Sequence, residues 1–293
     1  MPVRKPALGA QFYASVFDHL NTEIEDSFCS PRGPGALPVT RTARRRVLSV
    51  LAPHSPLRLS GPCQAWAFKE LAESRFPSTF VILGTNHTGL GGPLSTMLDP
   101  WQTPLGTVKT DKSLCMNLVE KAGVRLDFSP FVQEHSIEMQ LPFLQYASKD
   151  RLEELRFVPV VMQGRDLRLC QTLAKALAES EERCCLIVSS DLTHYGLDHN
   201  YVPFAHNRTQ GLYALDGKAI ELILNLDAEG FLAYCEKTKT TICGQGPIAT
   251  ALEFVKLMDG KKGKLLQYYT SGDVLETDRN AIGFAAMSFE SLD

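Results

Sequence analysis

The sequence has no long hydrophobic run and no strong excess of charge of either sign. None of its apolar stretches approaches the ~18–20 residues that a membrane-spanning helix requires. Its 293 residues carry a formal net charge of −3, which gives no electrostatic reason to expect nucleic acid or an anionic membrane as the main partner. Residues 1–6 are basic but do not lead into the apolar core of a secretory signal. We therefore expect a cytoplasmic protein without a membrane span that does not bind nucleic acid.

The sequence also lacks paired cysteines. Its eight cysteines are scattered, and none belongs to a Cys-x-x-Cys pair, which argues against a zinc ribbon and against a disulfide scaffold. Most of these thiols are expected to be small buried hydrophobic groups in a reducing compartment. A Gly-x-Ser-x-Gly motif is missing as well, so Ser189 and Ser190, close to Asp191 and His194, give only a weak hydrolase signal.

Several short apolar runs have the length and β-favouring composition of buried strands. They cover residues 47–52, 79–84 and 184–188, and each run ends in polar residues. Strands of this kind are buried on both faces and are typical of parallel sheets covered by helices. Segments with helical spacing, such as 112–121 and 166–179, lie between the runs. The sequence therefore predicts one α/β domain over residues 1–293, with a central, mostly parallel sheet flanked by helices.

Three of the seven histidines follow these apolar runs. His54, His87 and His194 each lie a few residues beyond the last buried position of a predicted strand. Parallel strands place their carboxyl ends on one side of the sheet, where α/β proteins bind ligands. We therefore expect the three side chains to converge. Asp191 precedes His194 by three residues and shares a helical face with it if Ser190 or Asp191 caps a helical turn.

A fourth histidine, His135, lies at the start of the segment 134–144. The apolar residues of this segment have helical spacing, and Glu134 and Glu138 stand near its beginning, where the helix dipole favours carboxylates. His135 is therefore either a further catalytic group of the site or a capping and supporting residue.

Glycine, proline and arginine mark the expected connections. Gly61 and Pro62 predict a loop that follows His54 and ends at residue 62, with a helix over 63–74. A basic cluster before the first strand is interpreted as a solvated segment, and its members are Arg41, Arg44, Arg45 and Arg46.

The residue types suit a metal site. Two histidines with one anionic ligand form the open facial site that is typical of non-haem iron. Asp191 can supply the third ligand, and so can Cys243, because a thiolate in a glycine-flanked loop can approach a metal ion without steric obstruction. Imidazole with thiolate also suits copper and zinc, so ligand type alone does not choose the metal. Cys243 is alternatively a buried turn residue without a ligand role.

Taken together, these motifs resemble the Memo family over nearly the whole chain. Glu-His-Ser-Ile-Glu and Ser-Ser-Asp-x-x-His are specific in combination, and their order matches the family. The segments that carry the likeness are Phe12-Tyr13, Ala52-Pro53-His54, Ile82-Leu83-Gly84-Thr85-Asn86-His87, Glu134-His135-Ser136-Ile137-Glu138-Met139, Ser189-Ser190-Asp191-Leu192-Thr193-His194-Tyr195-Gly196 and Ile242-Cys243-Gly244.

The resemblance implies a fold similar to the class III extradiol ring-cleaving dioxygenases, the LigB-like (phosphorylase/hydrolase-like) architecture. It implies His54, His87 and Cys243 as metal ligands, with Fe2+ as the expected ion and copper or zinc as alternatives. It also implies His194 as an acid and base, with Asp191 in the same pocket. The dioxygenases have a glutamate as third ligand where Memo proteins have the cysteine.

Two functions are compatible with such a site. The first is a metal-dependent redox enzyme or oxygenase-like protein that acts on an unidentified small substrate. The second is a binding or signalling module that keeps the metal pocket but engages a small ligand, a peptide or a partner protein without turnover. The chain has Ser55-Pro56-Leu57 where the family typically reads Ala-Gly-Tyr after Pro-His. Proline stiffens this loop and an aromatic wall of the pocket is missing, so substrate preference is expected to differ.

Overall fold

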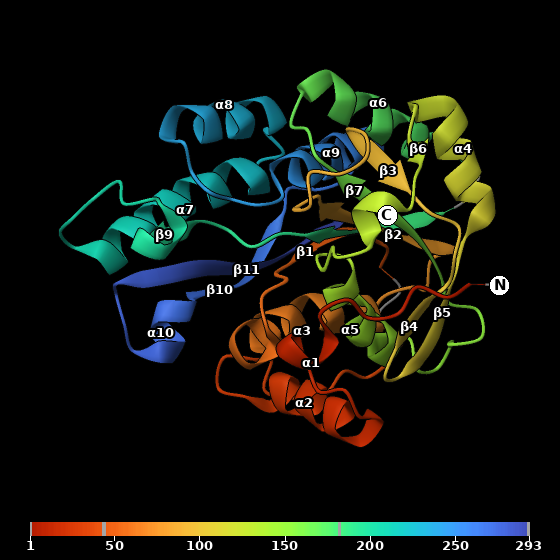
Figure 1. The fold of residues 1–293 in the computed structure, drawn as a ribbon, viewed down its shortest axis with the longest axis horizontal. Coiled ribbons are helices and arrows are strands. Elements are labelled where there is room, and N and C mark those ends of the chain that lie inside the picture. Colours follow the sequence, from red (N-terminus) through yellow and green to blue (C-terminus); the bar gives the residue numbers. More distant parts are fainter. Residues whose placement is uncertain (1, 43–44, 181–182, 292–293) are drawn as a thin grey trace.

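The computed structural model describes residues 2–42, 45–180 and 183–291 of the chain. The strands in these residues lie in one mixed sheet. They are β1 (Val47–Ala52), β2 (Thr79–Thr85), β3 (Leu94–Thr96), β4 (Trp101–Thr103), β5 (Gly106–Thr110), β6 (Arg125–Leu126), β7 (Arg156–Met162), β8 (Cys184–Ser189), β9 (His194–Gly196), β10 (Lys264–Thr270) and β11 (Asn280–Glu290). The main order is β10-β11-β1-β8-β2-β7-β3-β6 (Figure 1). β4 pairs with β5, β5 with β7, and β9 with β11.

The centre of the sheet is parallel. β1 pairs with β8, β8 with β2, and β2 with β7, all in parallel. The outer pairs β1–β11, β10–β11 and β3–β7 are antiparallel. The expected central, mostly parallel sheet is therefore confirmed. Because β1, β8 and β2 are neighbours, the residues that follow them emerge along the same edge.

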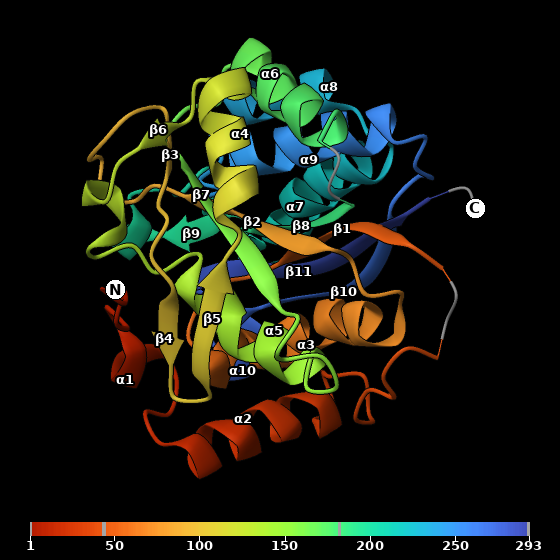
Figure 2. The ribbon, with the colours of Figure 1, turned by 90° about the vertical axis from the view of Figure 1, so that its right-hand side faces the viewer.

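Helices cover both faces of the sheet (Figures 1 and 2). The helices α1 and α2, with α3, α5 and α10, lie on one side, and α4 and α6 to α9 lie on the other. Their bounds are α1 (Gly9–Phe12), α2 (Phe17–Cys29), α3 (Leu57–Glu73), α4 (Lys112–Ala122), α5 (Leu141–Ala147), α6 (Leu167–Ala178), α7 (Arg208–Leu224), α8 (Ala228–Thr238), α9 (Gln245–Leu257) and α10 (Ser271–Leu275), with short 3-10 turns η1 (Ser129–Phe131), η2 (Glu138–Gln140) and η3 (Leu197–His199). In the described part of the chain, no helix combines the length and apolarity needed to cross a membrane.

The alternation of side chains along β8 explains why both faces are covered. Leu186 and Val188 belong to the core that α6 and α9 help to form, whereas Cys185 and Ile187 belong to the core beneath α2 and α3. Successive residues of a strand point to opposite faces, so an uninterrupted apolar run requires an apolar layer on each side.

The predicted loop from His54 to residue 62 is not present, and this prediction is wrong, because α3 already begins at Leu57. Both helix breakers, Gly61 and Pro62, lie inside this helix. A Cβ at Gly61 would lie 2.5 Å from Ser27 Oγ of α2, so the glycine permits close packing of the two helices. Tertiary packing therefore outweighs the local preference of Gly-Pro for a break.

Two arginines of the basic cluster form ion pairs or hydrogen bonds with other elements of the fold. Arg41 donates to the carbonyl of Leu71 at the end of α3 and forms an ion pair with Asp150. Arg45 forms ion pairs with Glu70 and Glu290. Arg44 lies outside the described residues.

Candidate metal centre

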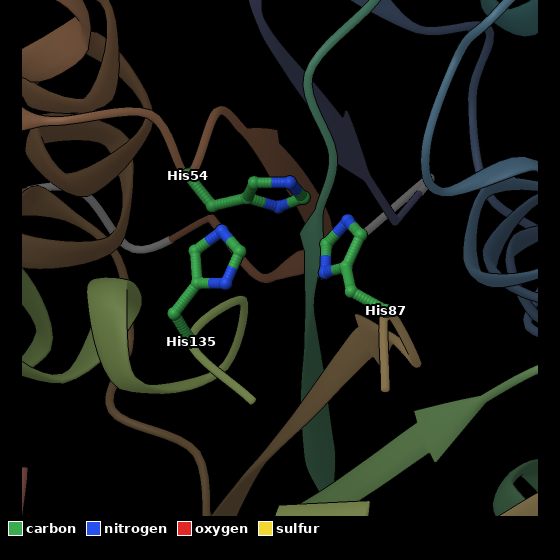
Figure 3. Close-up of side chains that lie close together, drawn as sticks. All are labelled: His54, His87 and His135. Carbon is green, nitrogen blue, oxygen red and sulfur yellow. The ribbon is translucent and has the colours of Figure 1, made fainter. Parts of the chain in front are cut away.

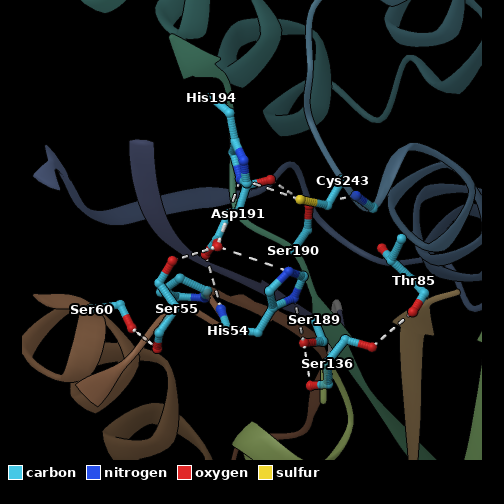
Figure 4. A network of polar contacts seen from close by, with 12 residues as sticks. His54, Ser55, Ser60, Thr85, Ser136, Ser189, Ser190, Asp191, His194 and Cys243 are labelled. Carbon is cyan, nitrogen blue, oxygen red and sulfur yellow. Dashed lines mark hydrogen bonds and ion pairs between the residues drawn. The ribbon is translucent and has the colours of Figure 1, made fainter. Parts of the chain in front are cut away.

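His54 follows β1, and a buried hydrogen-bond network fixes its ring (Figure 4). Its Nδ1 lies 3.1 Å from Ser189 Oγ at the end of β8. The Ser189 hydroxyl donates its proton to the carbonyl of Ser136 at 2.7 Å, so it must accept from His54. This pattern assigns the ring proton to Nδ1 and leaves the Nε2 lone pair free. Burial lowers the pKa of His54 well below its usual value, and His87 lowers it further.

His87 follows β2, and the buried carboxylate of Glu134 orients its imidazole. Glu134 accepts the backbone N–H of His87 at 2.6 Å, and its other oxygen lies 3.0 Å from Nδ1. An ionised carboxylate only accepts, so Nδ1 carries a proton, and Nε2 is the nitrogen that points away from Glu134 and can bind a metal ion. Burial by itself raises the pKa of Glu134, but the hydrogen bond and charge of His87, together with backbone N–H groups, outweigh it and lower the pKa to about 2. Histidine ligands of metals are commonly held by a carboxylate in this way.

His135 reaches the other two rings because its segment packs directly on β2. A Cβ at Gly84 would lie 2.5 Å from Ser136 Oγ and 2.7 Å from Ile137 Cγ1, so the close approach depends on glycine at this position. The His135 ring stacks on that of His87, with centroids 4.9 Å apart and planes 19° apart. His135 is therefore part of the cluster rather than only a residue at the start of a helix.

The three rings face one another at the carboxyl edge of the sheet (Figure 3). One nitrogen from each of His54, His87 and His135 can be chosen so that all lie within 4.8 Å of one another. His54 is buried, His135 is half-buried and His87 is exposed, so the cluster opens on the side of His87. Burial, followed by the charge of His87, lowers the pKa of His135. Such a group of converging imidazoles can bind a transition-metal ion.

Asp191, His194 and Cys243 form a second group beside His54 (Figure 4). One Asp191 oxygen accepts the backbone N–H of His54 at 3.0 Å, and the other lies 3.8 Å from Nε2 of both His54 and His194. The Nε2 atom of His194 lies 3.4 Å from the sulfur of Cys243. Burial lowers the pKa of His194 against the opposing effect of Asp191. Burial, reinforced by Asp191, raises the pKa of Cys243 well above its usual value, so the thiol is neutral at pH 7.

Neither Ser190 nor Asp191 caps a helical turn, the arrangement that would have placed Asp191 and His194 on one helical face. Residues 190–193 are not helical and lead into β9, because the backbone bonds to β11 instead. Leu192 donates its N–H to the carbonyl of Gly283 at 2.8 Å, and Gly283 donates to the carbonyl of Thr193 at 3.0 Å. Asp191 and His194 therefore approach each other along an extended segment.

The structure groups the predicted site residues in a different way from the expectation. His54 and His87, predicted as ligands, lie with His135, which was predicted as a catalytic group. Cys243, predicted as the third ligand, contacts His194. The identity of the third ligand and the catalytic roles of His194 and Asp191 stay predictions.

Sequence reasoning missed the residues that orient the cluster. Glu134 was placed at a helix start, although its position beside His135 was the available signal. Ser55 donates its hydroxyl to Asp191 at 2.7 Å, and its only signal was the departure from the usual family motif. The ring of His199 lies 5.1 Å from that of His194.

The serine hydroxyls near Asp191 are buried and already form hydrogen bonds to the backbone. Ser189 and Ser190 are both 0% exposed. Each donates to a backbone carbonyl, that of Ser136 and that of Asp191 respectively. Neither hydroxyl is available as a nucleophile in this arrangement, which removes the weak hydrolase signal.

The fold and the cluster define an α/β protein with three histidines, able to hold a metal ion, at the carboxyl edge of its sheet. The sequence pattern of Memo-like proteins matches residues 4–288. The chain is 40% identical over 292 residues to a MEMO1 family protein of Methanopyrus kandleri, with 98% of each chain covered. It is 36% identical to a MEMO1 family protein of Ignicoccus hospitalis, with 99% of each covered, and 33% identical to one of Methanobrevibacter smithii, with 98% of this chain and 100% of the relative covered. The chain therefore belongs to the Memo-like protein family.

Proposed function

We propose that this protein binds one transition-metal ion through His54, His87 and a third ligand. The observation that carries the proposal is the convergence of three imidazoles, two of which have the Nδ1 proton fixed by a buried acceptor, Ser189 or Glu134. That arrangement leaves Nε2 of both rings available, as metal-binding histidines require. Iron(II) is the proposed ion, and copper and zinc are alternatives that the same ligands accept.

His135 is the third ligand that the geometry favours, and Cys243 is the one that the family resemblance implies. A metal ligand must be deprotonated. Burial holds His135 neutral, so its ring can bind without losing a proton. Burial also holds the thiol of Cys243 protonated, so ligation by Cys243 requires release of a proton.

The proposed activity is an oxygenase-like redox reaction on a small substrate. Bound iron would supply redox chemistry and Lewis acidity at the cluster. His194 is neutral and can accept a proton from a substrate, and Asp191, 3.8 Å from its Nε2, would stabilise the imidazolium that results. Ser55 and the N–H of His54 hold the Asp191 carboxylate in place for this role. The exposed ring of His87 marks the side from which substrate would enter.

Titration with Co2+ tests the ligand set, because its visible bands report coordination and a near-ultraviolet band reports thiolate. We expect one Co2+ per chain in the wild type and none in a His54→Ala, His87→Ala double variant. A thiolate band that disappears in Cys243→Ser would assign the third position to Cys243. A spectrum without that band, with binding lost in His135→Ala, would assign it to His135. No Co2+ binding by the wild type would refute the metal site.

Oxygen consumption tests the reaction. Iron-loaded protein should consume oxygen in a screen of small substrates, above the rate of the His54→Ala, His87→Ala variant. Equal rates in both proteins, with metal bound in the wild type, would reject the redox activity and favour a binding module that keeps the metal pocket.

A further inference from the structure

Asp216, a buried carboxylate outside the histidine cluster, holds the segment that carries Asp191 and His194. It lies in α7 and is 0% exposed. Its Oδ1 accepts the backbone N–H of Thr193 at 3.2 Å, and its Oδ2 accepts the hydroxyl of Tyr268 at 2.7 Å. These donors are neutral groups, whereas buried carboxylates are usually paired with a cation.

Thr193 connects this carboxylate to His194 and to the loop that carries Cys243. It lies directly before His194, and its hydroxyl bonds to that of Thr240. Next to Thr240, the hydroxyl of Thr241 accepts the N–H of His194 at 2.8 Å and donates to its carbonyl at 2.7 Å. The loop that contains these threonines also carries Cys243. A shift of Thr193 would therefore move His194 and Cys243 relative to each other.

The backbone of β11 is shaped to admit the carboxylate. A Cβ at Gly283 would lie 2.1 Å from Asp216 Oδ2, so this position accommodates the carboxylate only as glycine. Gly283 also bonds through its own backbone to Leu192 and Thr193. The carboxylate and the strand thus both hold Thr193.

We propose that Asp216 is a positioning residue whose ionisation controls how His194 and Cys243 are presented to the histidine cluster. A charged acceptor binds an N–H group more strongly than a neutral one. The ionised carboxylate therefore fixes Thr193, and protonation loosens it. The effect on metal binding rests on the proposed function, whereas the effect on Thr193 does not.

The pKa values of the surrounding groups support this switch. Burial raises the pKa of Asp216 to about 6, although its hydrogen bonds limit the rise. The titratable groups that face it are Tyr268 of β10, Tyr201, and Tyr234 and Cys235 of α8. Burial raises the pKa of each of these groups as well, so all four are neutral near pH 6. Among these groups, Asp216 is the one that titrates near pH 6.

Asp216→Asn separates a positioning role from a purely structural one. The amide oxygen can accept from Thr193, and the amide N–H can donate to the hydroxyl oxygen of Tyr268, so both hydrogen bonds persist without the charge. Removing a buried charge that has no cation partner should raise the melting temperature at pH 7.5. If the carboxylate served only to stabilise the fold, its loss would instead lower the melting temperature of Asp216→Asn.

The amide resonance of Thr193 reports the switch directly and needs no metal. With 15N-threonine labelling, we expect its shift to titrate near pH 6 in the wild type and to show no such step in Asp216→Asn. Tyr268→Phe removes a donor that stabilises the ionised form, so the midpoint should move to higher pH. Tyr213→Phe is the matched control, because Tyr213 packs against Tyr268 with ring centroids 5.0 Å apart but donates to Asp273. A wild-type shift without a step, or the same midpoint in Tyr268→Phe, would overturn the proposal.

Co2+ affinity then tests the consequence for the site. At pH 7.5 we expect Asp216→Asn to bind about 3–10-fold more weakly than the wild type, less than the effect of losing a direct partner of a ligand. The ratio should shrink towards one at pH 5.5, where the wild-type carboxylate is itself mostly protonated. Equal affinities at both pH values would refute the control of the site. A wild type that does not bind Co2+ would refute the metal site, while the Thr193 titration would still decide the role of Asp216.

Discussion

Glu134 determines which nitrogen of His87 is free, although it is not itself a member of the histidine cluster. Its two oxygens accept backbone N–H groups from His87, His135 and Ser136 and the ring proton of His87. These four hydrogen bonds hold both the segment and the ring in place. At the scale of single residues, the cluster depends on the groups behind the rings as much as on the rings.

Glu134→Gln should therefore weaken metal binding about 10–100-fold, because a charged acceptor is lost and the amide can no longer accept from all of these donors. Calorimetric titration with Zn2+ measures the change. Glu153→Gln is the control, because Glu153 is exposed and its replacement should leave the affinity unchanged. Equal affinities of the two variants would show that Glu134 does not orient a ligand.

The stability of the protein should also depend on Asp216. Its pKa is about 6 in the folded protein, against an ordinary value of 3.8. Between these values the folded state binds more protons than the unfolded state, so the stability from this group is lost as the pH rises. About two pKa units correspond to roughly 3 kcal/mol. The free energy of unfolding of Asp216→Asn, relative to that of the wild type, should therefore rise by on the order of 2–3 kcal/mol between pH 4 and pH 7.5. Urea unfolding at the two pH values measures this difference. A constant difference would contradict the shifted pKa.

Part of this site could be predicted from the sequence alone. His54 and His87 follow apolar runs, and the parallel arrangement of strands brings such positions together. His135 was a candidate site residue, but its packing against the rings of His54 and His87 could not be predicted, because it depends on a contact between Gly84 and Ser136 that joins distant segments. The proton positions on the rings follow from partners such as Ser189, and no local pattern reveals them.

Close contacts between elements set the position of the loop before α9. A Cβ at Gly244 would lie 2.6 Å from Cβ and 2.7 Å from Oγ of Ser190, and the Gly244 N–H donates to that Oγ at 2.9 Å. The loop that carries Cys243 is therefore held against the end of β8. At the scale of elements, glycine allows this approach.

Gly244→Ala should force the loop away and destabilise the protein by about 1–3 kcal/mol. Gly217→Ala in α7 is the matched control, because nothing lies within 4 Å of a Cβ there. In a helix interior this change should stabilise by about 0.5–1 kcal/mol. Urea unfolding measures both variants, and equal shifts of the same sign would contradict the assigned contact.

The elements themselves were predicted well where an uninterrupted apolar run or a clear helical spacing marked them, as in β1, β2 and α4. The start of α3 was missed because Gly61 and Pro62 locally favour a break. Packing against Ser27 of α2 decides the outcome there. The sequence left the conformation of the segment after β8 open, and pairing with β11 makes it extended.

The whole molecule is organised by one sheet with an apolar core on each face. β8 supplies side chains to both cores, so loss of either should destabilise the other. We therefore predict that the chain unfolds as a single domain. Tryptophan fluorescence and far-ultraviolet circular dichroism should give coincident urea transitions, since Trp101 of β4 is 0% exposed and the dichroism reports all helices. Two separated transitions would show independent units.

The metal content of the purified chain tests the central claim most directly. Elemental analysis of protein prepared without oxygen and reconstituted with iron should find one ion per chain. The His54→Ala, His87→Ala variant should contain none, whereas a control variant of the exposed His206, His206→Ala, should match the wild type. A wild type that holds no iron, copper or zinc after reconstitution would contradict the account of the histidine cluster as a metal centre.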